Sequence, residues 1–180
     1  MMSISVLEAL AHFKKPTLVV FVVLAGFVAG IWINSTYFGD ASPVQPIEFS
    51  HRIHAGENEI PCQYCHVYAA RTPSAGVPSV EKCMGCHKSI ATDKPEIIKV
   101  AQYYAEQKPI PWIKVYDVPD FVHFTHKRHI KAGLECQDCH GPVDTMDRIT
   151  RQQPLRMPWC VDCHTKKEVE NGRDCLTCHK

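Results

Sequence analysis

The chain of 180 residues contains ten cysteines, and all ten belong to five copies of one pentapeptide, C-x-x-C-H. In this pentapeptide the two thiols can form thioether bonds to the vinyl groups of a haem, and the adjacent histidine can bind the haem iron. The copies, numbered here motifs 1 to 5, are Cys62-Gln-Tyr-Cys65-His66, Cys83-Met-Gly-Cys86-His87, Cys136-Gln-Asp-Cys139-His140, Cys160-Val-Asp-Cys163-His164 and Cys175-Leu-Thr-Cys178-His179. The pattern predicts five covalently attached haems c, each with its motif histidine as the proximal iron ligand.

Three other uses of paired cysteines fit this pattern less well. A structural zinc site combines two C-x-x-C pairs into one tetrahedron and needs no histidine after each second cysteine. A thioredoxin-like motif occurs once, beside a βαβ pattern, and a disulfide scaffold gives no role to five histidines at fixed positions. The set therefore predicts a multihaem c-type cytochrome, whose chemistry is electron transfer. The net charge of +1 gives no reason to expect a nucleic-acid partner.

A second motif supplies candidates for the opposite, distal side of each iron. The sequence F-x-H-x-x-H begins at Phe49 and again at Phe124, and each copy is followed by two haem motifs. The same order of motifs found twice indicates duplication of a two-haem module. Histidines three positions apart lie on one face of a helical turn and can still serve two different haems. We expect the distal ligands to include the four histidines of these motifs, which are His51, His54, His126 and His129.

The fifth distal ligand stays open. The two remaining histidines of the chain are His12 and His123. His12 precedes an apolar N-terminal run and is not expected to reach a haem. His123 has no counterpart in the first repeat, so it is either the fifth ligand or an ordinary packed or surface histidine. Met146 and Met157 are the alternatives, and a methionine ligand would raise the redox potential of its haem.

The N-terminal part of the chain has the composition of a membrane anchor. Residues 17–33 read TLVVFVVLAGFVAGIWI and carry no charge, and with their flanks they approach the ~20 residues that cross a bilayer. Lys14 and Lys15 before the run and Asp40 after it favour a cytoplasmic N-terminus. A cleaved signal peptide is the alternative, but the small-residue site at 39–41 lies far from the end of the run. We expect an uncleaved signal-anchor that crosses a bacterial inner membrane once and holds the haem-bearing part on the periplasmic side.

Four parts follow from these patterns. They are an N-terminal segment with a transmembrane helix (1–38), a first two-haem module (39–90), a linker with a short helix beginning at Pro95 (91–120) and a three-haem module (121–180). A soluble part this small buries too little apolar surface to be stable alone. We therefore expect a mostly irregular fold with small α-helices, in which the haems form much of the core and without which the chain does not fold.

Two connecting segments are predicted to lack regular structure. Prolines at 109, 111 and 119 predict an extended stretch in the linker, where Trp112 and Tyr116 pack either on a porphyrin or on protein. Pro73, Gly76 and Pro78 predict a loop over residues 71–80.

The order F-x-H-x-x-H, then C-x-x-C-H, resembles the class III (c3/c7-type) cytochromes. More specifically, most of residues 34–180 look like the pentahaem subunit of alternative complex III, and the membrane anchor matches in type. This finer resemblance is carried by His54-Ala55-Gly56, Tyr64, Gly76-x-Pro78, Met84, Pro111-Trp112-Ile-Lys-Val, Pro119-Asp-Phe-Val, Trp159 and Asp162. It implies a bacterial complex that oxidises quinol and passes electrons to a cytochrome c or another periplasmic acceptor. The implied partners are an iron–sulfur subunit, a polytopic quinol-binding subunit and a monohaem cytochrome c.

The resemblance also implies a pairing of ligands. By analogy, the first histidine of each F-x-H-x-x-H motif serves the nearest haem, that of His66 or His140, and the second histidine reaches further. The family often has histidine at the position of Tyr116 and tyrosine at that of His123. The chain departs from the family at these two positions, which bear on the fifth distal ligand.

Three functions are compared. The leading one is an electron-transfer subunit with no catalysis of its own. A stand-alone, single-anchor multihaem quinol dehydrogenase that feeds periplasmic reductases is the alternative, favoured by the short distance in sequence between the anchor and Cys62. A multihaem nitrite reductase fits less well, because its active haem typically sits on C-x-x-C-K and all five motifs here end in histidine.

Overall fold

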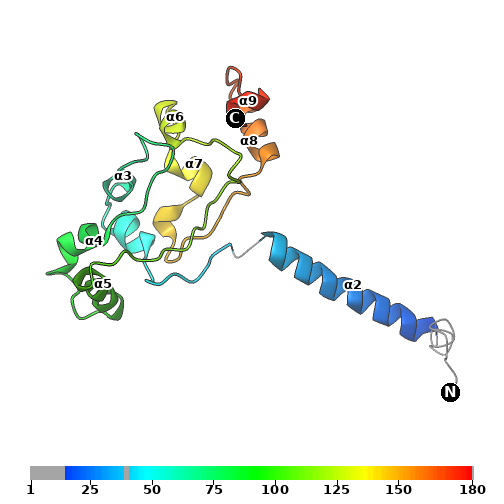
Figure 1. Ribbon diagram of the computed structural model, residues 1–180, viewed down its shortest axis with the longest axis horizontal. Coiled ribbons are helices and arrows are strands. Elements are labelled where there is room, and N and C mark those ends of the chain that lie inside the picture. The colour runs from blue at the N-terminus through cyan, green and yellow to red at the C-terminus, as the bar shows by residue number, and fades with distance from the viewer. Residues whose placement is uncertain (1–14, 39–40, 180) are drawn as a thin grey trace. The chain divides into compact units, whose positions relative to one another are not determined.

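The computed structural model describes the backbone of residues 15–38 and 41–179 and the side chains of residues 17–32 and 41–179. The predictions that concern His12, Lys14 and Asp40 lie outside the described residues. Two compact units are present, Met1–Asp40 and Ala41–Lys180, and each is described by itself (Figure 1).

The first unit contains helix α2, Lys15–Phe38, of 24 residues. Pro16 stands in its first turn, where proline is tolerated because the N–H it lacks has no helical partner there. The large apolar side chains described in α2 are exposed all around the helix, among them Val19, Phe21, Phe27 and Trp32. Among the residues searched, no helix is both long and apolar enough to cross a membrane. The predicted anchor is thus not shown by the described part of the chain and stays a prediction.

The second unit is built from short helices joined by loops, and residues 41–179 contain no β-strand. Its elements are η1 (Arg52–Glu57), α3 (Cys62–Cys65), α4 (Val80–His87), α5 (Pro95–Ala105), α6 (His126–Lys131), α7 (Cys136–His140), η2 (Val143–Thr145), α8 (Met157–Lys166) and α9 (Cys175–Cys178). The prediction of a small, irregular α fold is confirmed. The helix predicted to begin at Pro95 is present, and the loop predicted over residues 71–80 is irregular up to the start of α4.

Each haem motif has a helix of its own, because α3, α4, α7, α8 and α9 contain the two cysteines of motifs 1 to 5 in turn. A helical turn places residues three apart on one face, so the two thiols of a motif face the same way. Capping side chains stabilise the first turns of two of these helices. Asp174 accepts a hydrogen bond from the backbone N–H of Leu176 at 2.9 Å at the start of α9, and Glu135 and Asp138 form a capping box on α7.

Protein side chains form only a small core. The buried hydrophobic residues are Ile47, Ala69, Val80, Met84, Val100 and Ile110. All but Ala69 form one cluster where α4 packs on α5, with Trp112 and Tyr104 partly buried against it. Residues 121–179 contribute no buried hydrophobic side chain. This part of the chain therefore has no apolar core of its own, as expected if haems supply it.

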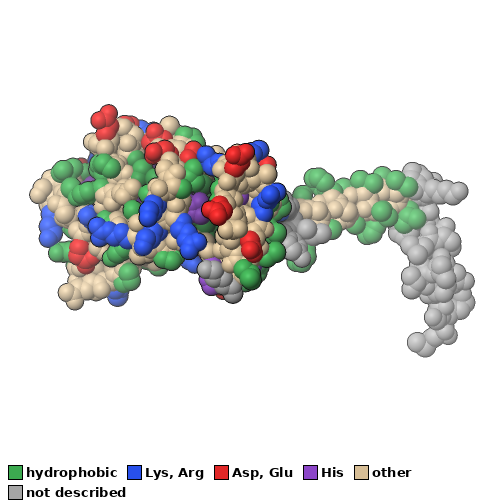
Figure 2. Space-filling model, turned by 90° about the horizontal axis from the view of Figure 1, so that it is seen from above, with side chains coloured by type: hydrophobic (Ala, Val, Ile, Leu, Met, Phe, Trp, Pro, Cys, Tyr) green, Lys and Arg blue, Asp and Glu red, His purple; other side chains and the backbone are tan. Residues whose placement is uncertain are grey.

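Contacts between η1 and η2 join the two halves of the second unit. Asp147 accepts hydrogen bonds from Ser50 Oγ at 2.7 Å and from Arg52 Nε at 3.1 Å, and the backbone N–H of Arg52 donates to the carbonyl of Met146 at 2.9 Å. Basic and acidic side chains alternate over the face of this unit seen in Figure 2, in keeping with the small net charge.

Candidate haem-binding site

A cavity of about 2490 Å³ runs through the second unit and is lined by residues of all five motifs. It is also lined by the candidate distal histidines His51, His54, His123, His126 and His129. A pocket for one small molecule measures about 300–1,000 Å³, so this cavity has room for several large cofactors.

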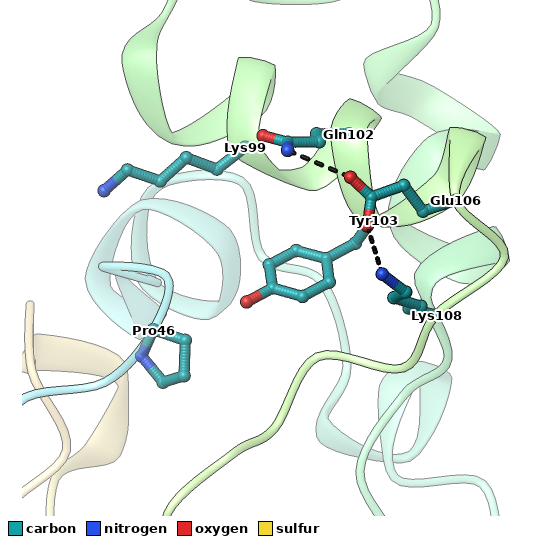
Figure 3. Close-up of a pocket in the computed structure, with 6 residues that line it drawn as sticks. All are labelled: Pro46, Lys99, Gln102, Tyr103, Glu106 and Lys108. Atoms are coloured by element: carbon teal, nitrogen blue, oxygen red, sulfur yellow. Dashed lines mark hydrogen bonds and ion pairs between the residues drawn. The ribbon is translucent and has the colours of Figure 1, made fainter.

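A smaller hollow of about 310 Å³ lies between Pro46 and α5 (Figure 3). No residue of a haem motif lines it. Three of its polar side chains bond one another, since Glu106 accepts hydrogen bonds from Gln102 at 3.0 Å and from Lys108 at 2.8 Å. Nothing in this hollow points to a cofactor.

The cysteines of the described residues do not form a site for direct metal binding. All ten are free thiols, and within the described residues no three His, Cys, Asp or Glu side chains are grouped to hold a metal ion. A tetrahedral zinc site would need such a group. Burial, as the largest cause, raises the pKa of five thiols, those of Cys65, Cys83, Cys136, Cys139 and Cys160.

Three motif histidines each face one histidine of an F-x-H-x-x-H motif across a nearly constant gap. The ring centres are 6.0 Å apart for His54 and His87, 6.3 Å for His126 and His140, and 6.1 Å for His129 and His164. Two metal–imidazole bonds of about 2.0 Å each, taking the zinc value as a guide, together with the two ring radii, account for this separation. Each gap therefore fits one haem iron bound by two imidazoles.

Hydrogen bonds fix the tautomer of most of these rings. Seven histidines place Nδ1 within hydrogen-bond distance of a backbone carbonyl, which can only accept. The pairs are His54–Ser50 at 2.8 Å, His66–Gly76 at 2.7 Å, His87–Ile90 at 3.0 Å, His126–Pro73 at 2.8 Å, His129–Thr125 at 2.8 Å, His164–Gly172 at 2.7 Å and His179–Phe121 at 3.3 Å. With the proton on Nδ1, the lone pair of Nε2 is free for a metal, which is how metal-binding histidines are usually held.

Comparison with known proteins agrees with this geometry. Residues 122–180 match the family of cytochrome c7 and related cytochromes c. The chain is also 28% identical, over 161 residues, to the multiheme cytochrome c subunit of menaquinone reductase from Nitratidesulfovibrio vulgaris strain Hildenborough, an alignment that covers 76% of this chain and 77% of that protein. These matches support a multihaem c-type cytochrome that is c7-like over residues 122–180. The predicted class of protein, a multihaem cytochrome c, and the predicted cofactor type, haem c, are confirmed. The assignment to alternative complex III is more specific than these matches and stays a prediction.

The duplication predicted for the cytochrome is visible in its side chains. Phe49 lies edge-on to His51, with ring centres 4.8 Å apart, and along the face of His54 at 4.3 Å. Phe124 repeats these contacts with His126 at 4.8 Å and His129 at 4.6 Å. The phenylalanine of each F-x-H-x-x-H motif thus contacts both histidines of that motif, and the two histidines lie near different haem motifs.

His51 has no ring pair at the separation found for the other three, but it lies beside motif 1. Burial, followed by the charges of nearby His66 and His54, lowers the pKa of His51 to about 4. Its Nδ1 is buried and has no hydrogen-bond partner among the described residues. Burial, followed by His126 and His66, likewise lowers the pKa of His140 to about 4. Both imidazoles are therefore neutral near pH 7, the form that binds iron.

Motif 5 differs from the other motifs. The ring that contacts His179 is Phe121, with centres 5.7 Å apart. His123 lies next to this motif, since its backbone N–H donates to the carbonyl of Cys178 at 2.8 Å, and it lines the cavity. Of the two alternative ligands, Met157 lines the cavity with its side chain 66% exposed, and Met146 does not line it.

The cytochrome arranges its motifs in a spatial order that differs from their order in the chain. Thiols of neighbouring motifs lie close enough to influence one another electrostatically, in the pairs Cys65 and Cys83, Cys62 and Cys136, Cys139 and Cys163, and Cys160 and Cys178. The motifs therefore follow one another as 2, 1, 3, 4, 5. In Figure 1, α4 lies toward one end of this unit and α8 and α9 toward the other, with α3 and α7 between. No signal in the linear sequence predicted this order.

Proposed function

We propose that the cytochrome is the membrane-anchored electron-transfer subunit of a quinone-linked complex, with five haems c attached through the ten motif cysteines. The observation that carries this proposal is the set of histidine pairs 6.0–6.3 Å apart. An iron bound by an imidazole on each face exchanges electrons and has no free position for a substrate. The haems supply the redox chemistry, and the chain binds and orients them.

The ligand assignment follows the geometry. His54, His126 and His129 are the proposed distal ligands opposite His87, His140 and His164. His51 is proposed for motif 1 because it lies beside His66. His123 is proposed for motif 5, because it lines the cavity beside Cys178.

Helix α2 is proposed to anchor the cytochrome, with its N-terminus in the cytoplasm and the haem unit on the periplasmic side. The uncharged run over 17–33 and the flanking charges support this placement. The proposed partners are an iron–sulfur subunit, a polytopic subunit that holds the quinone site and a monohaem cytochrome c. A separate quinone subunit is needed because one helix offers no enclosed pocket.

Two directions of electron flow are compatible with this role. The resemblance to alternative complex III favours oxidation of quinol and reduction of a periplasmic acceptor. The similarity to a menaquinone reductase subunit favours the reverse direction as a second candidate. We propose quinol oxidation, because the motifs that carry the finer resemblance extend over both modules.

The deciding experiment measures haem reduction by a menaquinol analogue in the intact membrane complex and in the purified single chain. Rapid reduction in the complex alone supports a relay that depends on a separate quinone site. Equal reduction of the isolated chain would instead support the stand-alone quinol dehydrogenase. Haem oxidation by a menaquinone analogue, without reduction by the quinol, would establish the reductase direction. A measurement of haem content tests whether all five motifs carry a haem, and five haems per chain are expected.

A further inference from the structure

His140 is an exception among the motif histidines. The other four donate Nδ1–H to a backbone carbonyl, whereas within the described residues the His140 ring has no such partner. Its ring is nonetheless held almost parallel to that of His126, with 8° between the planes. Some other contact must fix its orientation.

Tyr116 is the side chain in place to do so. Its ring meets the His140 ring edge-on, with centres 4.4 Å apart and 83° between the planes. An aromatic ring in this favoured edge-to-face geometry resists rotation of its neighbour.

The hydroxyl of Tyr116 is fixed in turn by three backbone groups. It lies 3.2 Å from the carbonyl of Thr150 and 3.4 Å from that of His140, and it accepts a hydrogen bond from the N–H of Gln152 at 3.0 Å. Tyr116 thus ties the extended linker to motif 3 and to the segment that follows η2. Burial raises the pKa of Tyr116, so the hydroxyl keeps its proton near neutral pH.

Gly141 allows this arrangement. It has φ of +71°, and a Cβ there would lie 2.6 Å from Cγ of Gln152, the residue whose N–H reaches Tyr116. A side chain at position 141 would displace Gln152, and with it the donor that holds the tyrosine.

We infer that Tyr116 is a positioning residue that sets the plane of the His140 ring opposite His126, in place of the carbonyl that holds the other motif histidines. This inference rests on the proposed attachment of a haem to motif 3. It gives Tyr116 a role other than packing on a porphyrin.

The test compares Tyr116→Leu, which removes the ring, and Gly141→Ala in the full, haem-loaded chain, with Tyr104→Leu as control. Tyr104 is also a hydrogen-bonded tyrosine, since its hydroxyl accepts from Lys88 Nζ at 3.2 Å, but it lies on α5. Low-spin electron paramagnetic resonance signals depend on the angle between the two axial rings, so they report the orientation of His140 directly. His140→Met identifies the signal of motif 3 by its loss.

We expect Tyr116→Leu and Gly141→Ala to shift the motif 3 signal and to leave the other four in place, while Tyr104→Leu changes none. An unshifted motif 3 signal in Tyr116→Leu, with five haems bound, would overturn the inference. Shifts spread over several haems would do the same, because they would indicate a general loss of packing. A wild-type chain without a haem on motif 3 would contradict the proposed function itself, which haem counting detects separately.

Discussion

The carbonyl oxygen of Pro73 accepts two hydrogen bonds from His126, one from the backbone N–H at 3.0 Å and one from Nδ1 at 2.8 Å. Pro73 belongs to the first module and His126 to the second. Three residues further on, the carbonyl of Gly76 accepts from Nδ1 of His66 at 2.7 Å. A single loop therefore orients a proximal histidine of motif 1 and the histidine opposite motif 3, so a disturbance of the loop should reach both sites.

Gly76→Ala is the change that should show this coupling. Gly76 has φ of +74°, and a Cβ would lie 2.9 Å from Cδ2 of Tyr68. We expect about 1–2 kcal/mol of backbone strain, a further cost from the contact with Tyr68, and a shift in the spectra of two haems. Electron paramagnetic resonance and thermal unfolding of the haem-loaded chain measure both effects.

Gly133→Ala is the matched control for this variant. Gly133 also has a left-handed backbone, with φ of +82°, but nothing lies within 4 Å of a Cβ there. Gly133→Ala should therefore show the stability cost of backbone strain without a shift in the spectra of the haems at motifs 1 and 3. If Gly76→Ala left the signals of motifs 1 and 3 unchanged, the loop would not be a shared support.

The fifth distal ligand can be decided by a pair of alanine variants. We expect His123→Ala to leave one of five haems high-spin, because His123 lies beside Cys178 and lines the cavity. Met157→Ala should keep all haems low-spin, since most of that side chain is exposed. Absorption and electron paramagnetic resonance spectra count the high-spin fraction. The reverse result would assign a methionine ligand and a raised potential to motif 5.

Acid should destabilise the cytochrome over a window set by His51 and His140. Burial lowers the pKa of both from 6.5 to about 4. Between these two pH values the unfolded chain binds protons that the folded chain does not. The stabilising contribution of the two neutral histidines is therefore fully present above pH 6.5 and is lost as the pH falls from 6.5 toward 4. An iron–nitrogen bond excludes the proton as well and acts in the same direction. Thermal unfolding midpoints of the holoprotein that stayed constant across this window would contradict the prediction.

The sequence predicted the local chemistry of the site better than its spatial arrangement. Motif spacing predicted five similar sites, and all five motifs line one cavity. The repeat of F-x-H-x-x-H predicted a duplicated module, and the contacts of Phe49 recur at Phe124, because both patterns depend on residues within one or two helical turns. The order 2, 1, 3, 4, 5 and the contact of Tyr116 with His140 depend on loop carbonyls and on an extended linker. Any residue supplies a carbonyl, so such contacts leave no pattern in the sequence.

The haems at motifs 2 and 5 are expected to differ in how much they stabilise the protein around them. Around motif 2, Val80, Met84 and Val100 are buried in a cluster of protein side chains, whereas residues 121–179 contain no buried hydrophobic side chain. Burying one large apolar side chain contributes about 1.5–3 kcal/mol, and a haem covers more area than any of them. Removing the haem of motif 5 should therefore unfold its neighbourhood, and removing that of motif 2 should be better tolerated.

Two double variants test this difference, Cys175→Ala with Cys178→Ala and Cys83→Ala with Cys86→Ala. Each deletes both thioether bonds of one haem and leaves its histidine in place. Limited proteolysis followed by mass spectrometry should find new cleavage sites within 121–179 in the first variant, and α4 and α5 still protected in the second. Equal protection in both would mean that the protein part of the C-terminal module is stable alone, contrary to the small core found there.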